Sequence, residues 1–220
     1  MKAIIVDGGK AVRLGVLPPK GLVRVGGIPL TGYLWARLVD LGITDVTLIT
    51  SKACREAYDE TVVGRALNLV MDKRMGGPLA AIYQVTEEFR DEDVIITTGD
   101  AFFSSLDSLR GGVPGYVLPL VDAPRARTFH IALDSSSSAR VSRSIQADGF
   151  SYASAIRVCQ CPPFWDGVRN MLIEGCTSII QALAWKSFCD IELRMVNGFW
   201  RNVNEPSDLV AVKDYLGESS

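Results

Sequence analysis

The first half of the chain alternates short apolar runs with segments of helical periodicity, and this alternation limits the fold more than any other feature. Apolar runs typical of buried strands lie at 2–6, 46–50, 67–71 and 94–98. Apolar residues recur at helical spacing between them, at 30–41, 54–63 and 79–89. Strands that alternate with helices predict a mainly parallel sheet with right-handed crossovers, so we expect an α/β fold.

The second half mixes shorter strand-like and helical segments. Strands are predicted at 116–120, 130–133, 152–158 and 191–196, with a polar turn or loop at 134–138. Helices are predicted at 164–173 and 179–188, and 210–216 lies in a last helix that Pro206 opens. Because 220 residues suit one core and no repeat or long linker interrupts them, we expect a single domain over 1–220.

Charge and composition argue against several classes of protein. A net charge of −2 gives no reason to expect a nucleic-acid partner or binding to an anionic membrane. No apolar run approaches the roughly 20 residues that span a bilayer, and no signal-peptide pattern is present, so we expect a cytoplasmic protein. Five scattered cysteines and one histidine do not form the pattern of a zinc site, and we expect buried, reduced thiols. The sequence leaves the oligomeric state open.

A glycine-rich loop with two cations follows the first predicted strand. Residues 7–14 read DGGKAVRL, and Lys20 follows six residues later. Glycines let backbone N–H groups approach phosphate oxygens, and Arg13 and Lys20 add fixed positive charge that suits a triphosphate. The P-loop and dinucleotide fingerprints are both absent, which disfavours a P-loop ATPase and a dehydrogenase. Such a loop alone is also common without a ligand, so the motif needs support from elsewhere in the chain.

Four segments in a fixed order provide that support. They read DGGKAVRL with PKGL and VGGIPL (7–30), GGPLAA (76–81), TGD (98–100) and WRNVNEPSDL (200–209). Together they resemble the NTP-transferase, or nucleotidyltransferase, superfamily, and the second and fourth are closest to molybdenum-cofactor guanylyltransferase-like proteins. The resemblance implies a Rossmann-like, three-layer, glycosyltransferase-A-like fold with a mainly parallel mixed sheet. It also implies an NTP-binding half at 1–110 and an acceptor-binding half at 111–220.

The resemblance further implies an activity and its partners. Such an enzyme moves a nucleoside monophosphate from an NTP, here with GTP favoured, to a small phosphorylated acceptor and releases pyrophosphate with the help of Mg²⁺. Two alternatives stay open. The chain also resembles sugar-1-phosphate and inositol-1-phosphate nucleotidyltransferases that use CTP or another NTP. It could instead be a catalytically degraded protein that binds nucleotide without transferring it.

The motifs assign roles to particular residues by position. The nucleotide-binding residues implied are Val6, Asp7, Gly8, Gly9, Lys20, Asp72, Gly77, Pro78 and Asp100. The catalytic residues implied are Lys20, Arg13 and Asp100, with Asp100 also the ligand of the metal. Asn202 and Asn204 are expected to bind the acceptor. They stand where the sugar- and inositol-phosphate enzymes usually carry aspartates, which favours the molybdenum-cofactor branch.

Three positions in the first loop depart from the family pattern. Asp7 replaces a small alanine, Ala11 a second glycine, and Val12 a serine, threonine or arginine. A β-carbon at Ala11 narrows the approach of the backbone to phosphate. Asp7 could accept hydrogen bonds from the N1–H and N2–H donors of guanine, or it could cap a turn. These departures are the reason for keeping the alternative of a degraded site.

Overall fold

The computed structural model describes most of the chain. The described residues are 1–9, 12–15, 19–74, 76–111, 115–121, 130–133, 139–142, 150–179 and 191–218. The loop predicted at 134–138, nearly all of the helix predicted at 179–188, and Ala11 lie outside these residues. The expectations for those parts therefore stay predictions.

The first half follows the predicted order of strands and helices. Its elements are β1 (Lys2–Val6), α1 (Leu30–Asp40), β4 (Val46–Thr50), α2 (Lys52–Asp59), α3 (Val62–Ala66), β5 (Asn68–Met71), α4 (Pro78–Tyr83), α5 (Thr86–Phe89) and β6 (Asp93–Thr98). Two predicted helices are each broken in two. Thr61 ends the first break by accepting a hydrogen bond from the Gly64 amide, which starts α3. The second break falls at Val85, whose φ of −110° is not helical.

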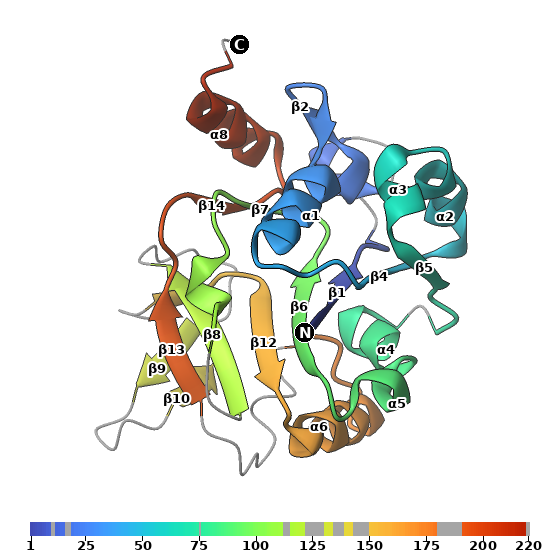
Figure 1. Ribbon diagram of the computed structural model, residues 1–220, viewed down its shortest axis with the longest axis vertical. Coiled ribbons are helices and arrows are strands. Elements are labelled where there is room, and N and C mark those ends of the chain that lie inside the picture. Colours follow the sequence, from blue (N-terminus) through green and yellow to red (C-terminus); the bar gives the residue numbers. More distant parts are fainter. Residues whose placement is uncertain are drawn as a thin grey trace.

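The strands of the first half are parallel, and the order in which the chain adds them to the sheet reverses beside β1. The strands β5, β4, β1 and β6 are neighbours in that order and all run parallel. The chain leaves β1 toward β4 and β5 and then returns to the other side of β1 as β6 (Figure 1). Ligands of such sheets bind at the carboxyl ends of the strands, at the point where the strand order reverses. The loops after β1 and β6 lie at that point.

The second half widens the sheet with antiparallel strands. It contributes β8 (Gly115–Val121), β9 (His130–Leu133), β10 (Ala139–Ser142), β11 (Phe150–Tyr152), β12 (Ala155–Cys159), α6 (Pro162–Ile173) and β13 (Ile191–Met195). β12 pairs antiparallel with β6 and β8, and β13 pairs parallel with β8. These six strands and the four of the first half form one mixed sheet of ten. The strand predicted at 152–158 is broken at Ser154, which has a positive φ of 47°.

Small elements that the sequence did not predict join the ends of the chain to the sheet. β7 (Ala101–Phe103) directly follows the turn after β6 and pairs antiparallel with β14 (Trp200–Asn202). β2 (Arg24–Val25) and β3 (Ile28–Pro29) form a hairpin before α1. The last helix, α8 (Pro206–Leu216), opens at Pro206 as predicted, with a capping box between Glu205 and Asp208.

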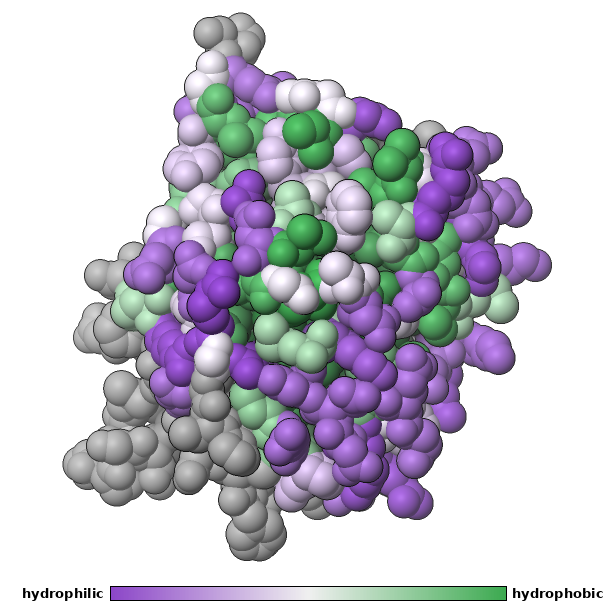
Figure 2. Space-filling view, in the orientation of Figure 1, coloured by the Kyte–Doolittle hydropathy of each residue, from purple (hydrophilic) through white to green (hydrophobic). Residues whose placement is uncertain are grey.

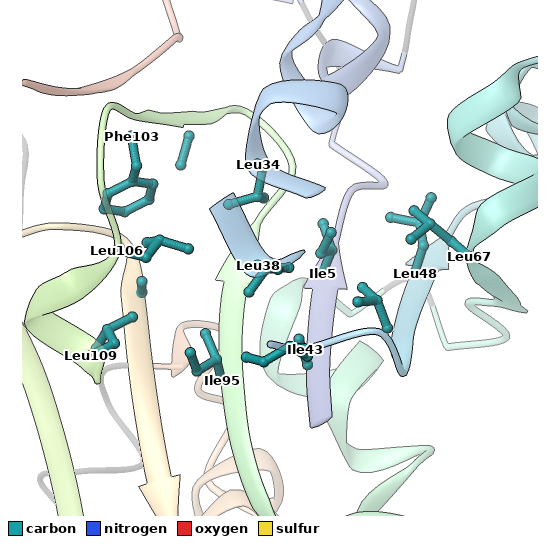
Figure 3. Close-up of a cluster of buried hydrophobic side chains, with 14 of the residues drawn as sticks. Ile5, Leu34, Leu38, Ile43, Leu48, Leu67, Ile95, Phe103, Leu106 and Leu109 are labelled. Atoms are coloured by element: carbon teal, nitrogen blue, oxygen red, sulfur yellow. The ribbon is translucent and has the colours of Figure 1, made fainter. Parts of the chain in front are cut away.

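Two apolar layers cover the faces of the sheet, as a three-layer fold requires. Alternate residues of β1 enter different layers: Ile4 and Val6 pack with α4 and α6, whereas Ala3 and Ile5 pack with α1 and α2. Figure 3 shows Leu34 and Leu38 of α1 beside Ile5 in the second layer. In Figure 1, α4, α5 and α6 are grouped together at a distance from α1. This alternation decides which side chains can reach the loops at the strand ends.

The surface and the cysteines complete the description. Figure 2 shows hydrophobic residues exposed among hydrophilic ones on the face viewed there. Exposed large hydrophobic side chains include Val39 of α1 and Val210 and Tyr215 of α8. Every helix in the described part of the chain is too short or too polar to cross a membrane. Cys54, Cys159 and Cys176 are free thiols, but Cys161 is disulfide-bonded, so the expectation of reduced thiols was wrong at that position.

Candidate active site

A cavity of about 310 Å³ opens at the point where the strand order reverses. It is lined by Val6, Asp7, Gly8, Gly9, Lys20, Ile49, Ser51, Asp72, Gly77, Pro78, Ala81, Thr98 and Asp100. All of the residues predicted to bind nucleotide are in this set. Ile49, Ser51, Ala81 and Thr98 were not predicted. The structure therefore brings the motif residues together around one space, as their places at the ends of parallel strands suggested.

A cluster of charged and amide groups lies at one end of the cavity. The Lys20 ammonium donates hydrogen bonds to Asp100 Oδ2 at 3.0 Å and to Asn204 Oδ1 at 2.7 Å. Arg13 Nη2 donates to the same Asn204 oxygen at 3.3 Å. Lys20 is only 8% exposed, so its charge is held among these partners rather than in bulk solvent. The three predicted catalytic residues thus lie together, and Asn204 joins them.

Three separate stretches of backbone fix this cluster. Lys20 begins a single 3₁₀ turn, Lys20–Leu22, that follows the first loop. Asp100 lies in the turn between β6 and β7. The Val203 amide donates to the Asp100 carbonyl at 2.8 Å, directly after β14 pairs with β7. This pairing places Asn204 beside Lys20.

Asp7 lines the cavity, but its carboxylate faces the protein interior. Residues alternate along β1, so Val6 faces the α4 layer and Asp7 faces the α1 and α2 layer. Asp7 Oδ2 accepts hydrogen bonds from the Gly21 amide at 2.9 Å and from the Tyr58 hydroxyl. Because these donors occupy Asp7 Oδ2 inside the protein, the hypothesis that this carboxylate reads the edge of guanine loses support. The bond from the Gly21 amide caps the turn at Lys20–Leu22, which agrees with the alternative of a turn cap. Asp7 thus joins the first loop to the Lys20 turn and to α2.

Burial controls the charge of Asp7. Desolvation raises the pKa of its carboxyl to about 6, and the nearby negative charge of Asp100 adds to the rise. Hydrogen bonds from Tyr58 and Gly21 and the charge of Lys20 oppose it. The same contact raises the pKa of the Tyr58 phenol, which is buried and faces a carboxylate.

Two glycines leave room for the Asp7 side chain. A β-carbon on Gly21 would lie 2.6 Å from Asp7 Oδ2, and one on Gly99 would lie 2.5 Å from Asp7 Cβ. Both distances are shorter than real Cβ contacts, so each position requires glycine. The Gly99 clash would occur with any side chain at position 7, and a β-carbon on Gly21 would also meet Tyr58 and Thr31. The two glycines therefore permit close packing around position 7.

Asp72 marks the other end of the cavity. Its Oδ1 accepts from the Arg74 amide at 2.9 Å and from Gln84 Nε2 at 3.1 Å, which fixes the carboxylate beside α4. Gly77 has a φ of 87°, and a β-carbon there would meet the backbone of Thr177. Asp72 follows β5 and Asp100 follows β6, three strands away, or about 14 Å at the usual strand spacing. That separation suits a nucleotide lying across the strand ends.

The two asparagines expected to bind the acceptor are not equivalent. Asn204 lies in the Lys20 cluster, as described above. Asn202 lies within β14, opposite Ala101, and does not line the cavity. Its Oδ1 is buried and has no hydrogen-bond partner. The structure therefore places Asn204 near the predicted chemistry and leaves the role of Asn202 a prediction.

The donors at the Lys20 end fit a magnesium ion that a triphosphate would complete. Among the described residues, no three histidine, cysteine, aspartate or glutamate side chains gather into a metal cluster. Asp100 offers a carboxylate, and the amide oxygen of Asn204 lies on the other side of the same ammonium group. Mg²⁺ needs only one or two carboxylates when phosphate oxygens and water supply its remaining ligands.

The fold and the site together define an α/β protein with a cavity and a cluster of charged side chains at the point where the strand order reverses. The model of the MobA-like NTP transferase domain family matches residues 3–111, about half of the chain. The chain belongs to the NTP-transferase superfamily of transferase enzymes, as the motifs predicted.

Two proteins of Haloferax volcanii are similar to the chain in sequence. The chain is 29% identical to a UTP–glucose-1-phosphate uridylyltransferase over 48% of its own length and 45% of the relative's. It is 24% identical to a low-salt glycan biosynthesis nucleotidyltransferase over 99% of its own length and 66% of the relative's. The chain thus spans about half to two thirds of the length of these relatives.

Solved structures confirm the fold over the whole chain. A Bacillus anthracis protein described as a glucose-1-phosphate thymidylyltransferase matches 100% of the chain and 96% of its own, with a TM-score of 0.82 and 16% identity. The inositol-1-phosphate CTP transferase of T. maritima matches 99% and 95%, with a TM-score of 0.79 and 17% identity. The CTP:phosphocholine cytidylyltransferase of Streptococcus pneumoniae matches 98% of both chains, with a TM-score of 0.78 and 18% identity.

Proposed function

We propose that this protein transfers a nucleoside monophosphate from an NTP to a sugar phosphate or polyol phosphate and releases pyrophosphate. The observation that carries the proposal is the cluster of Lys20, Asp100 and Asn204 at the end of the cavity, with Arg13 bound to the same amide. The relative that matches the chain along its length is named for glycan biosynthesis. The solved structures that share its fold are named for glucose-1-phosphate, inositol-1-phosphate and phosphocholine.

The reaction needs positioning and charge more than proton transfer. An oxygen of the acceptor's phosphate attacks the α-phosphorus in line, and the bond from that phosphorus to the bridging oxygen of pyrophosphate breaks. The second pKa of a phosphate monoester is about 6, so the nucleophile is already anionic at neutral pH and no general base is required. This fits a chain whose single histidine, His130, lies in β9 and not in the cavity lining.

The residues of the cluster divide the remaining work. Lys20 and Arg13 would offset the charge that develops on the α-phosphate and the leaving pyrophosphate. Backbone amides of Gly8 and Gly9 would hold phosphate oxygens. Asp100, with the amide oxygen of Asn204 beside it, would hold Mg²⁺, which neutralises charge on the triphosphate. Lys20 would exchange part of its contact with Asp100 for contact with the nucleotide.

A second candidate is the guanylyl transfer suggested by the motif resemblance. Two observations favour it: Asp72, Gly77 and Pro78 line the cavity, and the matching family model is named for MobA-like domains. The proposal that GTP is the nucleotide now rests on Asp72, Gly77 and Pro78, because the Asp7 carboxylate is occupied inside the protein. The relatives favour the sugar- and polyol-phosphate reading instead.

Pyrophosphate release tests both candidates. The protein would be assayed with each of the four NTPs and Mg²⁺, against glucose-1-phosphate, inositol-1-phosphate, phosphocholine and molybdopterin, with Lys20→Ala as the matched control. NTP binding would be measured alongside by calorimetric titration. Release that needs a sugar or polyol phosphate and is lost in the variant supports the proposal. Release with GTP and molybdopterin alone would transfer it to the second candidate. Tight NTP binding without release on any acceptor would make the chain a nucleotide-binding protein.

A further inference from the structure

Two adjacent threonines at the end of β6 lie in different environments. Thr97 faces the α1 and α2 layer, and its hydroxyl donates a hydrogen bond to the Ser154 carbonyl at 3.0 Å. Thr98 faces the opposite side and lines the cavity. Its Oγ1 is buried and has no hydrogen-bond partner among the described residues. Both residues are threonines of one strand, so only their surroundings distinguish them.

Several apolar side chains line the cavity together with Thr98. Thr98 is in register with Val6 of β1, and Ala81 of α4 and Ile49 of β4 line the same space. A hydroxyl buried among such groups without a partner destabilises the folded protein, because the hydrogen bonds it made to water are not replaced. A ligand with a polar atom at this point would remove that cost.

We propose that the Thr98 hydroxyl forms a hydrogen bond with a polar atom of the nucleoside part of the bound nucleotide and helps select it. The proposal rests on the proposed function. Phosphate groups have their cations at Lys20, which bonds to Asp100, and at Arg13, which bonds to Asn204. The wall shared by Val6, Ala81 and Thr98 carries no charge, and a hydrophobic wall with one placed hydroxyl is typical of sites for a base or a sugar.

Matched valine variants test the proposal. Thr98→Val keeps the shape of the side chain and removes the hydroxyl. We expect nucleotide affinity to fall about five- to twentyfold, while the thermal midpoint without nucleotide stays the same or rises. Thr97→Val should do the reverse, with a lower midpoint and an affinity within about twofold of wild type, because its hydroxyl has a partner inside the protein. Thr98→Ser should keep most of the affinity.

Calorimetric titration of wild type and the three variants with the preferred NTP and Mg²⁺ measures these affinities. If Thr98→Val bound the nucleotide as tightly as wild type, the proposal would be overturned. It would also be overturned if the thermal midpoint of Thr98→Val fell enough to account for its loss of nucleotide affinity. No binding of any NTP by the wild type would instead be a failure of the proposed function. Titration with the matching 2′-deoxy NTP locates the partner of the hydroxyl. If wild type and Thr98→Val then bind equally well, the partner is the 2′-hydroxyl. If their affinities still differ, the partner is the base or the rest of the sugar.

Discussion

Asp7 and Asp100 follow neighbouring parallel strands, and the two aspartate side chains have different roles. Asp7 is 4% exposed, bonds to Gly21 and Tyr58, and has a pKa raised to about 6. Asp100 is partly exposed at the cavity and pairs with Lys20. The position at a strand end is shared, so the direction of the side chain and the groups it meets determine the role.

The comparison teaches that an acidic residue at the end of a parallel strand is not by itself a catalytic residue. Along β1, alternation directs Asp7 away from the cavity and into the layer of α1 and α2. Asp100 lies beyond the last pleat of β6, in a turn whose carbonyl is held by the Val203 amide. One carboxylate therefore stabilises the scaffold, and the other is free to face ligand and metal.

The largest effect is expected from Asp100→Asn, which keeps the shape of the side chain and removes its charge. We expect metal-dependent transfer to fall by about 10³-fold or more, corresponding to roughly 4 kcal/mol of transition-state stabilisation. Metal-free nucleotide binding should persist, because one repulsion toward the triphosphate is gone. Steady-state rates and Mg²⁺ titrations measure this. An active Asp100→Asn beside an inactive Asp7→Asn would reverse the assignment of the two carboxylates.

Lys20→Ala should have the next largest effect. Removing the ammonium leaves Asp100 and Asn204 without their shared partner and removes one of the two cations proposed for the phosphates. We expect transfer to slow by about 10²-fold, or roughly 3 kcal/mol, with the fold intact. Lys2→Ala, which removes a lysine paired with Glu92 far from the cavity, serves as the control. Near-normal turnover of Lys20→Ala would remove Lys20 from the mechanism.

Asp7→Asn should change stability and its pH dependence. The folded state raises the pKa of Asp7 from 3.8 to about 6, so the folded protein binds this proton more tightly than the unfolded chain. The stabilising contribution is therefore full below about pH 4, is lost as the pH rises toward 6, and is constant above that. We expect the unfolding free energy of wild type relative to Asp7→Asn to fall by about 2 kcal/mol between pH 4 and pH 7.

Urea unfolding of both proteins at intervals across that range measures the difference. A difference that stays constant or grows with pH would show that the carboxylate is not held in the buried site described here. Transfer activity of Asp7→Asn, corrected for the folded fraction, should change much less than that of Asp100→Asn.

The smallest effect is expected from Tyr58→Phe. Loss of the hydroxyl removes a hydrogen bond to a buried carboxylate, which should destabilise the fold by about 1–2 kcal/mol at neutral pH. The loss should be smaller near pH 5, where Asp7 is largely protonated. Tyr33→Phe is the matched control, because Tyr33 donates to the Val25 carbonyl and its loss should not depend on Asp7. Equal pH dependence in the two variants would contradict the proposed pairing.

The sequence predicted the strands of the first half well and the smaller elements poorly. β1 and β4 match the predicted bounds, because each is a run of apolar and β-branched residues with polar residues on either side. β7 and β14 were missed, since each has only three residues and pairs with a strand almost a hundred positions away. Their pairing depends on tertiary contact, for which a local pattern carries no signal.

The cavity was predicted in the same uneven way. The glycine loop, Asp72 and Asp100 were found because ligands gather at strand ends and because the motifs resemble a known family. The inward direction of Asp7 had a signal that went unused, since Ala3 and Ile5 share its face of β1. Tyr58 had none, because its hydroxyl meets Asp7 from 51 positions away. Thr98 could have been found by alternation with Ile96, although its missing hydrogen bond could not.

The pairing of β14 with β7 also bears on when during synthesis the site can exist. Lys20 and Asn204 are separated by 184 positions, and the strands that surround the cavity are all complete by Thr98. A chain emerging from the ribosome can therefore form the strands around the cavity early, because amino-terminal regions generally fold first. Its lysine nevertheless lacks Asn204 until β14 has been made and has paired with β7. The cluster is therefore complete only after translation has passed Asn204.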